Sequence, residues 1–173
     1  MQRFAVLGAG FIGSVHARNL AENPQVEFVS VYDAAADRAA AIAGQYGAKA
    51  AASVDEAIDG VDAVFIASST NTHAANLKAA VDAGVAALCE KPIDLSLERA
   101  REVVEYAKGA KVMVNFNRRF DPDHAELKRI VDAGGRAIFT EVTELIGAEQ
   151  ILAGRGKTPQ AARDILATID AME

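Results

Sequence analysis

Gly8-Ala9-Gly10-Phe11-Ile12-Gly13 is the stretch that decides the fold of this chain of 173 residues. A short apolar run, residues 4–7, comes directly before it, and apolar residues at helical spacing begin near Gly13. Gly8 permits a tight turn, Gly10 lets the backbone approach a diphosphate, and Gly13 lets the helix pack close to the strand. The N–H groups and the dipole at the start of that helix favour phosphate charge. The stretch therefore predicts a strand, a turn and a helix that bind a dinucleotide.

Asp33 supports this prediction because it lies 20 residues past Gly13, at the end of the second predicted strand. A carboxylate there can accept a hydrogen bond from a ribose 2′-OH and would repel a 2′-phosphate, which favours NAD over NADP. Arg38, one turn later, leaves NADP open. The alternative to a dinucleotide site is a glycine turn with a purely structural role, followed by an aspartate that caps a helix.

Strands and helices alternate along the chain, which predicts an α/β fold of the Rossmann type, a doubly wound parallel sheet covered by helices. The predicted strands are residues 4–7, 26–32, 48–51, 61–67, 85–89 and 111–116. The predicted helices are one from about Gly13 to before Pro24, then 33–46, 53–60, 73–83, one capped by Ser96, and one from Asp121-Pro122 to Gly134. We expect residues 1–135 to form the nucleotide-binding domain. Residues 136–173 would add a strand at 137–146, a loop at 153–157 and a C-terminal helix packed on the same domain.

Composition narrows the class of protein. Apolar residues make up 51% and charged residues 24%, as in a soluble globular domain. The net charge is −6 without a polybasic stripe, so nucleic acid is not an expected partner. We expect a cytoplasmic protein without a membrane span, an internal disulfide or a metal site, because no long apolar run or signal peptide is present and Cys89 is the single cysteine. We expect Cys89 to be buried, and His16 and His124 to lie on helix surfaces.

Three further segments end predicted strands: residues 68–73, Cys89-Glu90-Lys91-Pro92, and residues 115–122 with their Asn-Arg-Arg-Phe sequence. Together with the glycine-rich turn, they resemble the Gfo/Idh/MocA family of sugar and inositol dehydrogenases, especially inositol 2-dehydrogenase-like members. The resemblance runs from Arg3 to about Gly134. It implies NAD(P)-dependent oxidation of a polyol or sugar hydroxyl.

The resemblance also implies roles for individual residues. Lys91 would lie close to the nicotinamide and the substrate hydroxyl as the catalytic residue. The cofactor-binding residues would be Gly8, Gly10, Phe11, Ile12, Gly13, Asp33, Ser68, Ser69, Thr70, Asn71, His73, Glu90, Lys91, Pro92, Asn117 and Arg118. General chemistry agrees, because a lysine at the carboxyl end of a strand can position a hydroxyl and stabilise an alkoxide. Lys91 as a solvated loop cation and His73 as a capping or packing residue are the alternatives.

The chain departs from the family after Gly135. Family members continue into a second, mostly antiparallel domain that supplies the substrate pocket, the oligomer interface, and an aspartate and a histidine that work with the lysine. This sequence has no such continuation, and residues 151–173 resemble the family's C-terminal helix, so we interpret the chain as internally deleted. We expect a monomer or weak homodimer that binds NAD with little or no turnover. An active polyol dehydrogenase and a scaffold that binds nothing are the alternatives.

Overall fold

The computed structural model describes residues 1–122, 125 and 129. The chain separates into two compact units, Met1–Phe116 and Asn117–Glu173, and each is described here by itself.

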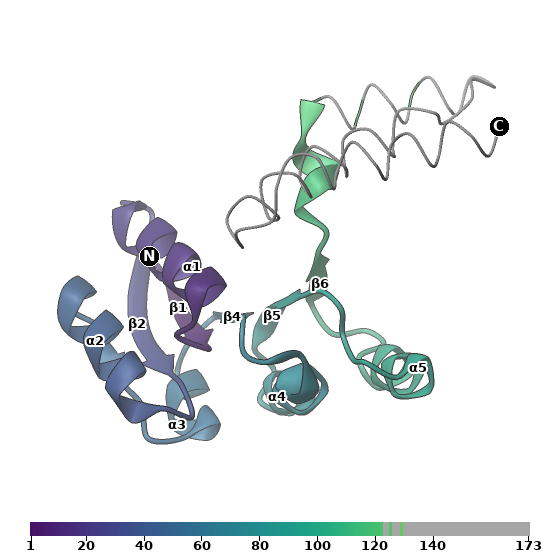
Figure 1. The fold of residues 1–173 in the computed structure, drawn as a ribbon, viewed down its shortest axis with the longest axis horizontal. Coiled ribbons are helices and arrows are strands. Elements are labelled where there is room, and N and C mark those ends of the chain that lie inside the picture. The colour runs from purple at the N-terminus through teal and green to yellow at the C-terminus, as the bar shows by residue number, and fades with distance from the viewer. Residues whose placement is uncertain (123–124, 126–128, 130–173) are drawn as a thin grey trace, which may run out of the picture. The chain divides into compact units, whose positions relative to one another are not determined.

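The first unit is built on a six-stranded sheet in the order β3-β2-β1-β4-β5-β6 (Figure 1). All its neighbouring strands run parallel. The strands are β1 (Gln2–Leu7), β2 (Val26–Tyr32), β3 (Lys49–Ala50), β4 (Ala63–Ile66), β5 (Ala86–Glu90) and β6 (Val112–Asn115). The predicted doubly wound parallel sheet is confirmed. The strand order reverses between β1 and β4, so ligands of such folds bind outside the carboxyl ends of these two strands.

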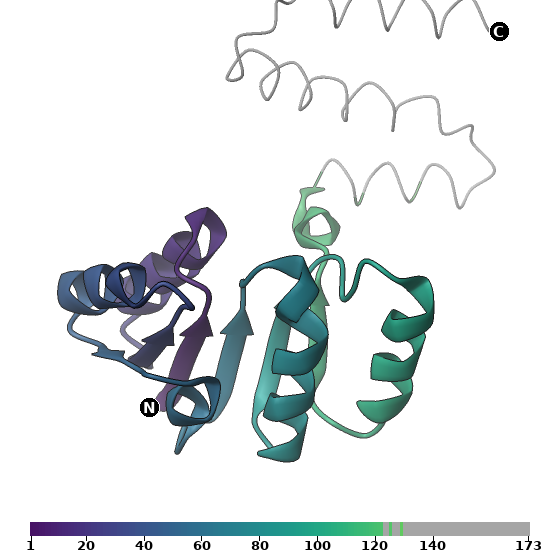
Figure 2. The ribbon, with the colours of Figure 1, turned by 60° about the horizontal axis from the view of Figure 1, so that its bottom comes forward.

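Five helices connect the strands of this unit and cover both faces of its sheet (Figure 2). They are α1 (Phe11–Glu22), α2 (Ala36–Tyr46), α3 (Val54–Ile58), α4 (Thr70–Asp82) and α5 (Leu97–Tyr106). Side chains alternate along β1: Ala5 and Leu7 join the core under α3 and α4, whereas Val6 joins the core under α1 and α2. The two cores follow from the two-residue period of a strand buried on both faces.

Several helix ends have the capping residues that the sequence predicts. Ser53 and Ser96 accept hydrogen bonds from the N–H groups of Glu56 and Arg99, at 3.1 and 3.4 Å, and so cap α3 and α5. Gly47 ends α2 with a φ of 71°. In contrast, α4 begins at Thr70 instead of the predicted residue 73, and α2 begins at Ala36 instead of 33. The late start of α2 has a physical cause, because the Asp33 side chain binds the N–H of Ala35 before the helix begins.

In the second unit, the described residues form a short 3₁₀ helix, η1 (Asn117–Phe120), and the start of a helix at Pro122. The N–H of Ala125 donates to the carbonyl of Asp121 at 3.0 Å, which confirms the predicted helix start. The elements predicted at 137–146 and 158–173 lie outside the described residues.

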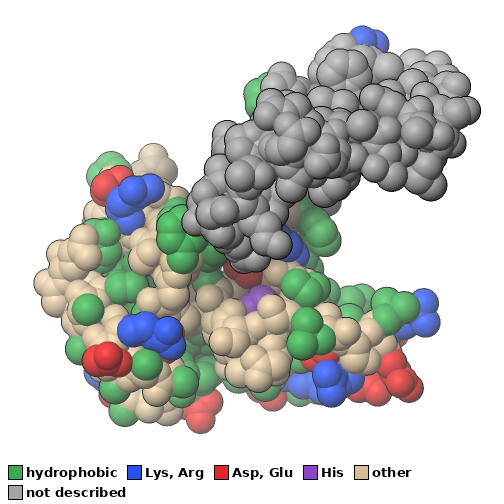
Figure 3. Space-filling view, in the orientation of Figure 1, with side chains coloured by type: hydrophobic (Ala, Val, Ile, Leu, Met, Phe, Trp, Pro, Cys, Tyr) green, Lys and Arg blue, Asp and Glu red, His purple; other side chains and the backbone are tan. Residues whose placement is uncertain are grey.

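Two further properties of the described residues concern membrane spanning and the distribution of surface charge. No helix among them is long and apolar enough to span a bilayer. On the face seen in Figure 3, the charged side chains of both signs are scattered in small groups.

Candidate functional site

The three glycines of the turn after β1 have different surroundings. Gly8 has a φ of +105°, and a Cβ there would lie 2.5 Å from the carbonyl oxygen of Ala67. A Cβ at Gly13 would lie only 1.8 Å from the carbonyl oxygen of Gly8. A Cβ at Gly10 would meet nothing within 4 Å. Gly8 and Gly13 are therefore required by close packing, whereas the space beside Gly10 is open to a ligand.

The N-terminus of α1 adjoins this open space. Gly10 is its N-cap and provides no side-chain hydrogen bond, and the first turn holds no acidic residue. The N–H groups of a first helical turn lack partners within the helix and carry the positive end of its dipole. Phe11 and Ile12, the first two residues of α1, are 82% and 42% exposed. The arrangement suits an anionic group that approaches backbone N–H groups directly.

Asp33 lies beside the glycine turn, as the sequence predicts. Its Oδ2 accepts a hydrogen bond from the N–H of Ala9 at 2.7 Å, and its Oδ1 accepts from Ala35 and from Arg38 Nη2, both at 2.8 Å. Burial raises the pKa of Asp33, but these hydrogen bonds outweigh burial and hold the pKa below its ordinary value. The side chain is 9% exposed and that of Arg38 is 56% exposed, so an anionic carboxylate and a more accessible guanidinium lie together.

The loop after β4 forms a second wall next to the glycine turn, because β4 pairs with β1. Ser68 lies at its centre: its hydroxyl is 2.7 Å from Thr72 Oγ1 and accepts a hydrogen bond from Asn76 at 3.0 Å. Ser69 is the N-cap of α4 but makes no side-chain capping bond. Ser69 and Asn71 are exposed, whereas Ser68 and Thr70 are partly buried.

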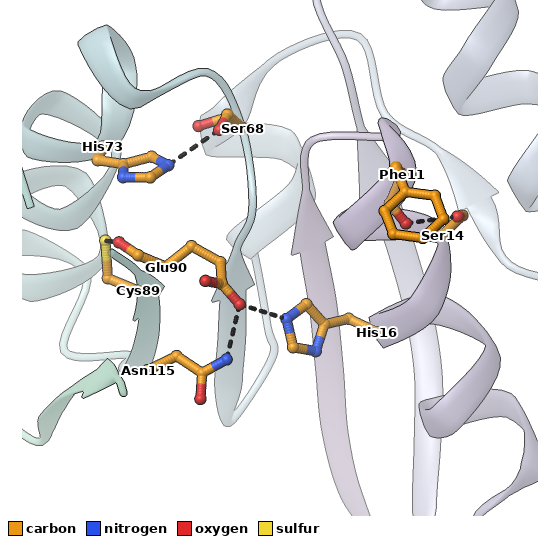
Figure 4. A network of polar contacts seen from close by, with 8 residues as sticks. All are labelled: Phe11, Ser14, His16, Ser68, His73, Cys89, Glu90 and Asn115. Carbon is orange, nitrogen blue, oxygen red and sulfur yellow. Dashed lines mark hydrogen bonds and ion pairs between the residues drawn. The ribbon is translucent and has the colours of Figure 1, made fainter. Parts of the chain in front are cut away.

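His73 lies beneath this loop instead of at its surface, with 2% exposure. Its Nε2 is 2.9 Å from the carbonyl oxygen of Ser68 (Figure 4). Its Nδ1 is 2.8 Å from the carbonyl oxygen of Pro92. The ring therefore joins the loops that follow β4 and β5. This geometry matches the packing role that the sequence left open for His73.

The loop after β5 carries the predicted catalytic lysine. Lys91 is exposed, and Cys89, two residues before it, is fully buried as predicted. Burial raises the pKa of the Cys89 thiol to about 12. Between them, Glu90 accepts hydrogen bonds through Oε1 from His16 Nε2 at 3.1 Å and from Asn115 Nδ2 at 2.6 Å.

Sequence reasoning missed this cluster. The prediction that His16 lies on a helix surface was wrong: its side chain is 14% exposed and its ring packs edge-on against Phe65 at 5.0 Å. Asn115 lies in a segment that the sequence singled out, but no role was predicted for it. The one available signal was the position of both residues next to segments that were already of interest.

Asn117 and Arg118 belong to the second unit, where Arg118 Nη1 lies 3.7 Å from Asp121 Oδ2. Their predicted role in cofactor binding stays a prediction.

Comparison with known proteins supports the resemblance. Residues 2–118 match the family model GFO_IDH_MocA, described as an oxidoreductase family with an NAD-binding Rossmann fold. The inositol 2-dehydrogenase of Rhizobium meliloti is 46% identical over 137 residues, which cover 76% of this chain and 41% of the relative.

Solved structures of inositol dehydrogenases are also similar to this chain. A myo-inositol dehydrogenase from Corynebacterium glutamicum is 45% identical, with a TM-score of 0.69 over 79% of this chain and 43% of its own. A scyllo-inositol dehydrogenase from Lactobacillus casei, solved with NAD(H) and scyllo-inositol, is 26% identical, with a TM-score of 0.68 over 78% and 42%. The chain therefore spans about two fifths of the length of the relatives it matches.

The remaining residues match a different model. Residues 125–173 are similar to the family described as D-galactarate/Altronate dehydratase, C-terminal. Residues 119–124 separate the two matched ranges and lie close in the sequence to the division between the two units. The likeness of residues 151–173 to the C-terminal helix of the first family stays a prediction.

Proposed function

Because this chain belongs to the Gfo/Idh/MocA oxidoreductase family, we propose that it binds NAD(H) at the carboxyl ends of β1 and β4 with little or no turnover of its own. The contact between Asp33 and the glycine turn carries this proposal. Asp33 Oδ2 lies 2.7 Å from the N–H of Ala9, next to the open space at Gly10. A diphosphate on the α1 N-terminus would thus have its adenosine ribose beside a carboxylate.

The residues present fit this cofactor. Gly10 leaves room for a diphosphate where any larger residue would place a side chain. The ribose hydroxyls would compete with Arg38 for Asp33, since Arg38 is exposed and can move aside. An anionic Asp33 would repel a 2′-phosphate, so we propose NAD(H) over NADP(H). The NAD(H) complex of the Lactobacillus casei relative supports this choice.

The loops after β4 and β5 would hold the nicotinamide end. When bound, the nicotinamide ring accepts or gives a hydride. Ser68, Ser69, Thr70 and Asn71 would line one side, and Glu90, Lys91 and Pro92 the other. His73 would support the nicotinamide end indirectly, through the carbonyl groups of Ser68 and Pro92, because its ring is buried between them. The Lys91 ammonium would face the substrate hydroxyl.

The relatives' names indicate an inositol or related polyol as the substrate class. Hydride transfer requires a substrate held against the nicotinamide with water controlled. This chain spans about two fifths of its relatives' length, and we propose that residues 1–173 by themselves do not hold a polyol in that geometry. This is the reason to expect binding without efficient turnover, in a monomer or a weak homodimer.

Calorimetric titration with NAD⁺ and NADH tests the binding, and an NADH absorbance assay with myo-inositol and other polyols tests the turnover. We expect saturable binding, a higher melting temperature with NAD(H), and no steady NADH production. A scaffold without a ligand would show an unchanged melting temperature. Robust NAD⁺ reduction would instead support the active dehydrogenase and overturn the proposed lack of turnover.

A further inference from the structure

Glu90, His16 and Asn115 form one hydrogen-bonded cluster from three separate elements. His16 comes from α1, Glu90 from the end of β5 and Asn115 from the end of β6. Both donors point at the Glu90 carboxylate (Figure 4). The side chains of Glu90 and His16 are only 15% and 14% exposed, so the cluster is largely removed from solvent.

The hydrogen bonds keep Glu90 ionised. Burial raises the pKa of Glu90, but the bonds from Asn115 and His16 outweigh this and hold the pKa below its ordinary value. An amide nitrogen can only donate, and His16 Nε2 donates when it carries the ring proton. Both are therefore charge-assisted bonds to a carboxylate, the stronger class of hydrogen bond.

The cluster connects two parts of the proposed dinucleotide site. His16 lies three residues after Gly13, on the helix that begins at the glycine turn. Glu90 directly precedes Lys91, so the carboxylate that His16 and Asn115 hold belongs to the residue to which the Lys91 peptide is joined. The position of the Lys91 peptide is thereby tied to α1 on one side and β6 on the other.

We propose that His16 and Asn115 are positioning residues that hold Glu90, and through it the Lys91–Pro92 loop, at the nicotinamide end of the site. This inference rests on the proposed function. It predicts that the cluster supports binding of the nicotinamide half of NAD⁺ and not of the ADP-ribose half, which would lie on the glycine turn and Asp33. Comparing NAD⁺ with ADP-ribose therefore separates the two contributions.

The experiment measures the dissociation constants of NAD⁺ and ADP-ribose by calorimetry for the full chain and four variants. His16→Phe keeps an aromatic ring against Phe65 but removes the donor, whereas His16→Gln keeps a donor. Asn115→Ala removes the second donor, and Glu105→Gln is the control. Glu105 is an exposed carboxylate on α5, paired with Lys108 away from the cluster.

We expect His16→Phe and Asn115→Ala to weaken NAD⁺ binding about fivefold or more, the lower end of typical couplings between sites. ADP-ribose should stay within about twofold, His16→Gln should recover part of the NAD⁺ affinity, and the control should change neither ligand. Equal weakening of both ligands, or unchanged NAD⁺ affinity, would overturn the positioning role. An unmodified chain that binds neither ligand would instead refute the proposed function itself, and the inference with it.

Hydrogen exchange provides a second readout that needs no ligand. In His16→Phe, the amide of Lys91 should exchange faster while the amides of α4 keep their protection. Faster exchange throughout the sheet would show a general loss of stability and contradict the positioning role.

Discussion

The carboxylate of Asp33 accepts a 2.7 Å hydrogen bond from the N–H of Ala9, although 24 residues separate them in the sequence. The bond spans the ends of β1 and β2, which are paired through Leu7 and Tyr32. It places a negative charge beside the turn before any ligand arrives. Both the proposed cofactor preference and the expected acid sensitivity of the first unit depend on this carboxylate.

Replacement of Asp33 should change cofactor preference. We expect Asp33→Asn to weaken NAD⁺ binding about tenfold, because hydrogen bonds to charged groups contribute about 1.5–3 kcal/mol and the neutral amide keeps one acceptor. NADP⁺ should lose less or gain, since repulsion of the 2′-phosphate disappears. Titration of both cofactors measures the ratio. Asp37→Asn removes a charge from the first turn of α2 and is the matched control. Equal losses for the two cofactors would contradict the assignment.

Alanine variants of Gly13, Gly10 and Gly44 should have three different outcomes, because the three glycines have different surroundings. Gly13→Ala should destabilise the fold by about 3 kcal/mol or more, because its Cβ would overlap the Gly8 carbonyl. Gly10→Ala should cost at most about 1 kcal/mol of stability as an N-cap change, yet weaken NAD⁺ binding. Gly44→Ala, in an open position within α2, should stabilise the fold by about 0.5–1 kcal/mol. Urea unfolding measures all three, and unchanged NAD⁺ affinity in Gly10→Ala would count against a diphosphate at that position.

Stability should fall in acid because folding lowers the pKa of both Asp33 and Glu90 from their ordinary values of 3.8 and 4.5. A carboxyl with a lowered folded-state pKa stabilises fully above its ordinary pKa, and the contribution is lost as the pH falls through the folded pKa. The loss due to Glu90 should therefore begin near pH 4.5 and continue below it. Urea unfolding at several pH values measures this slope. Glu90→Gln should flatten it, and an unchanged slope would contradict the lowered pKa.

Cys89 should resist alkylation in the folded chain. Its side chain is fully buried and burial raises the pKa of the thiol to about 12, so the reactive thiolate is scarce and inaccessible. We expect iodoacetamide at mildly alkaline pH to modify it only after denaturant is added, as followed by mass spectrometry. Rapid modification without denaturant would contradict the burial of β5.

Much of the first unit could be predicted because its signals are local. Gly8 and Gly13 are required by backbone geometry within a few residues of each other, and Ser53 and Ser96 cap helices that begin at the next residue. The helix starts of α2 and α4 were placed less well. The Asp33 side chain competes for the backbone N–H of Ala35, and propensity alone does not reveal such competition.

The sequence by itself determined the parallel α/β fold, the glycine turn and the position of Asp33, because spacing and periodicity express local backbone preferences. Only the tertiary structure decided that His16 turns toward Glu90, 74 residues away, and that His73 is buried between two carbonyls. Those contacts depend on which strands are neighbours at the carboxyl edge of the sheet. Strand order is fixed by the packing of the whole unit, so no local pattern around His16 or His73 could reveal it.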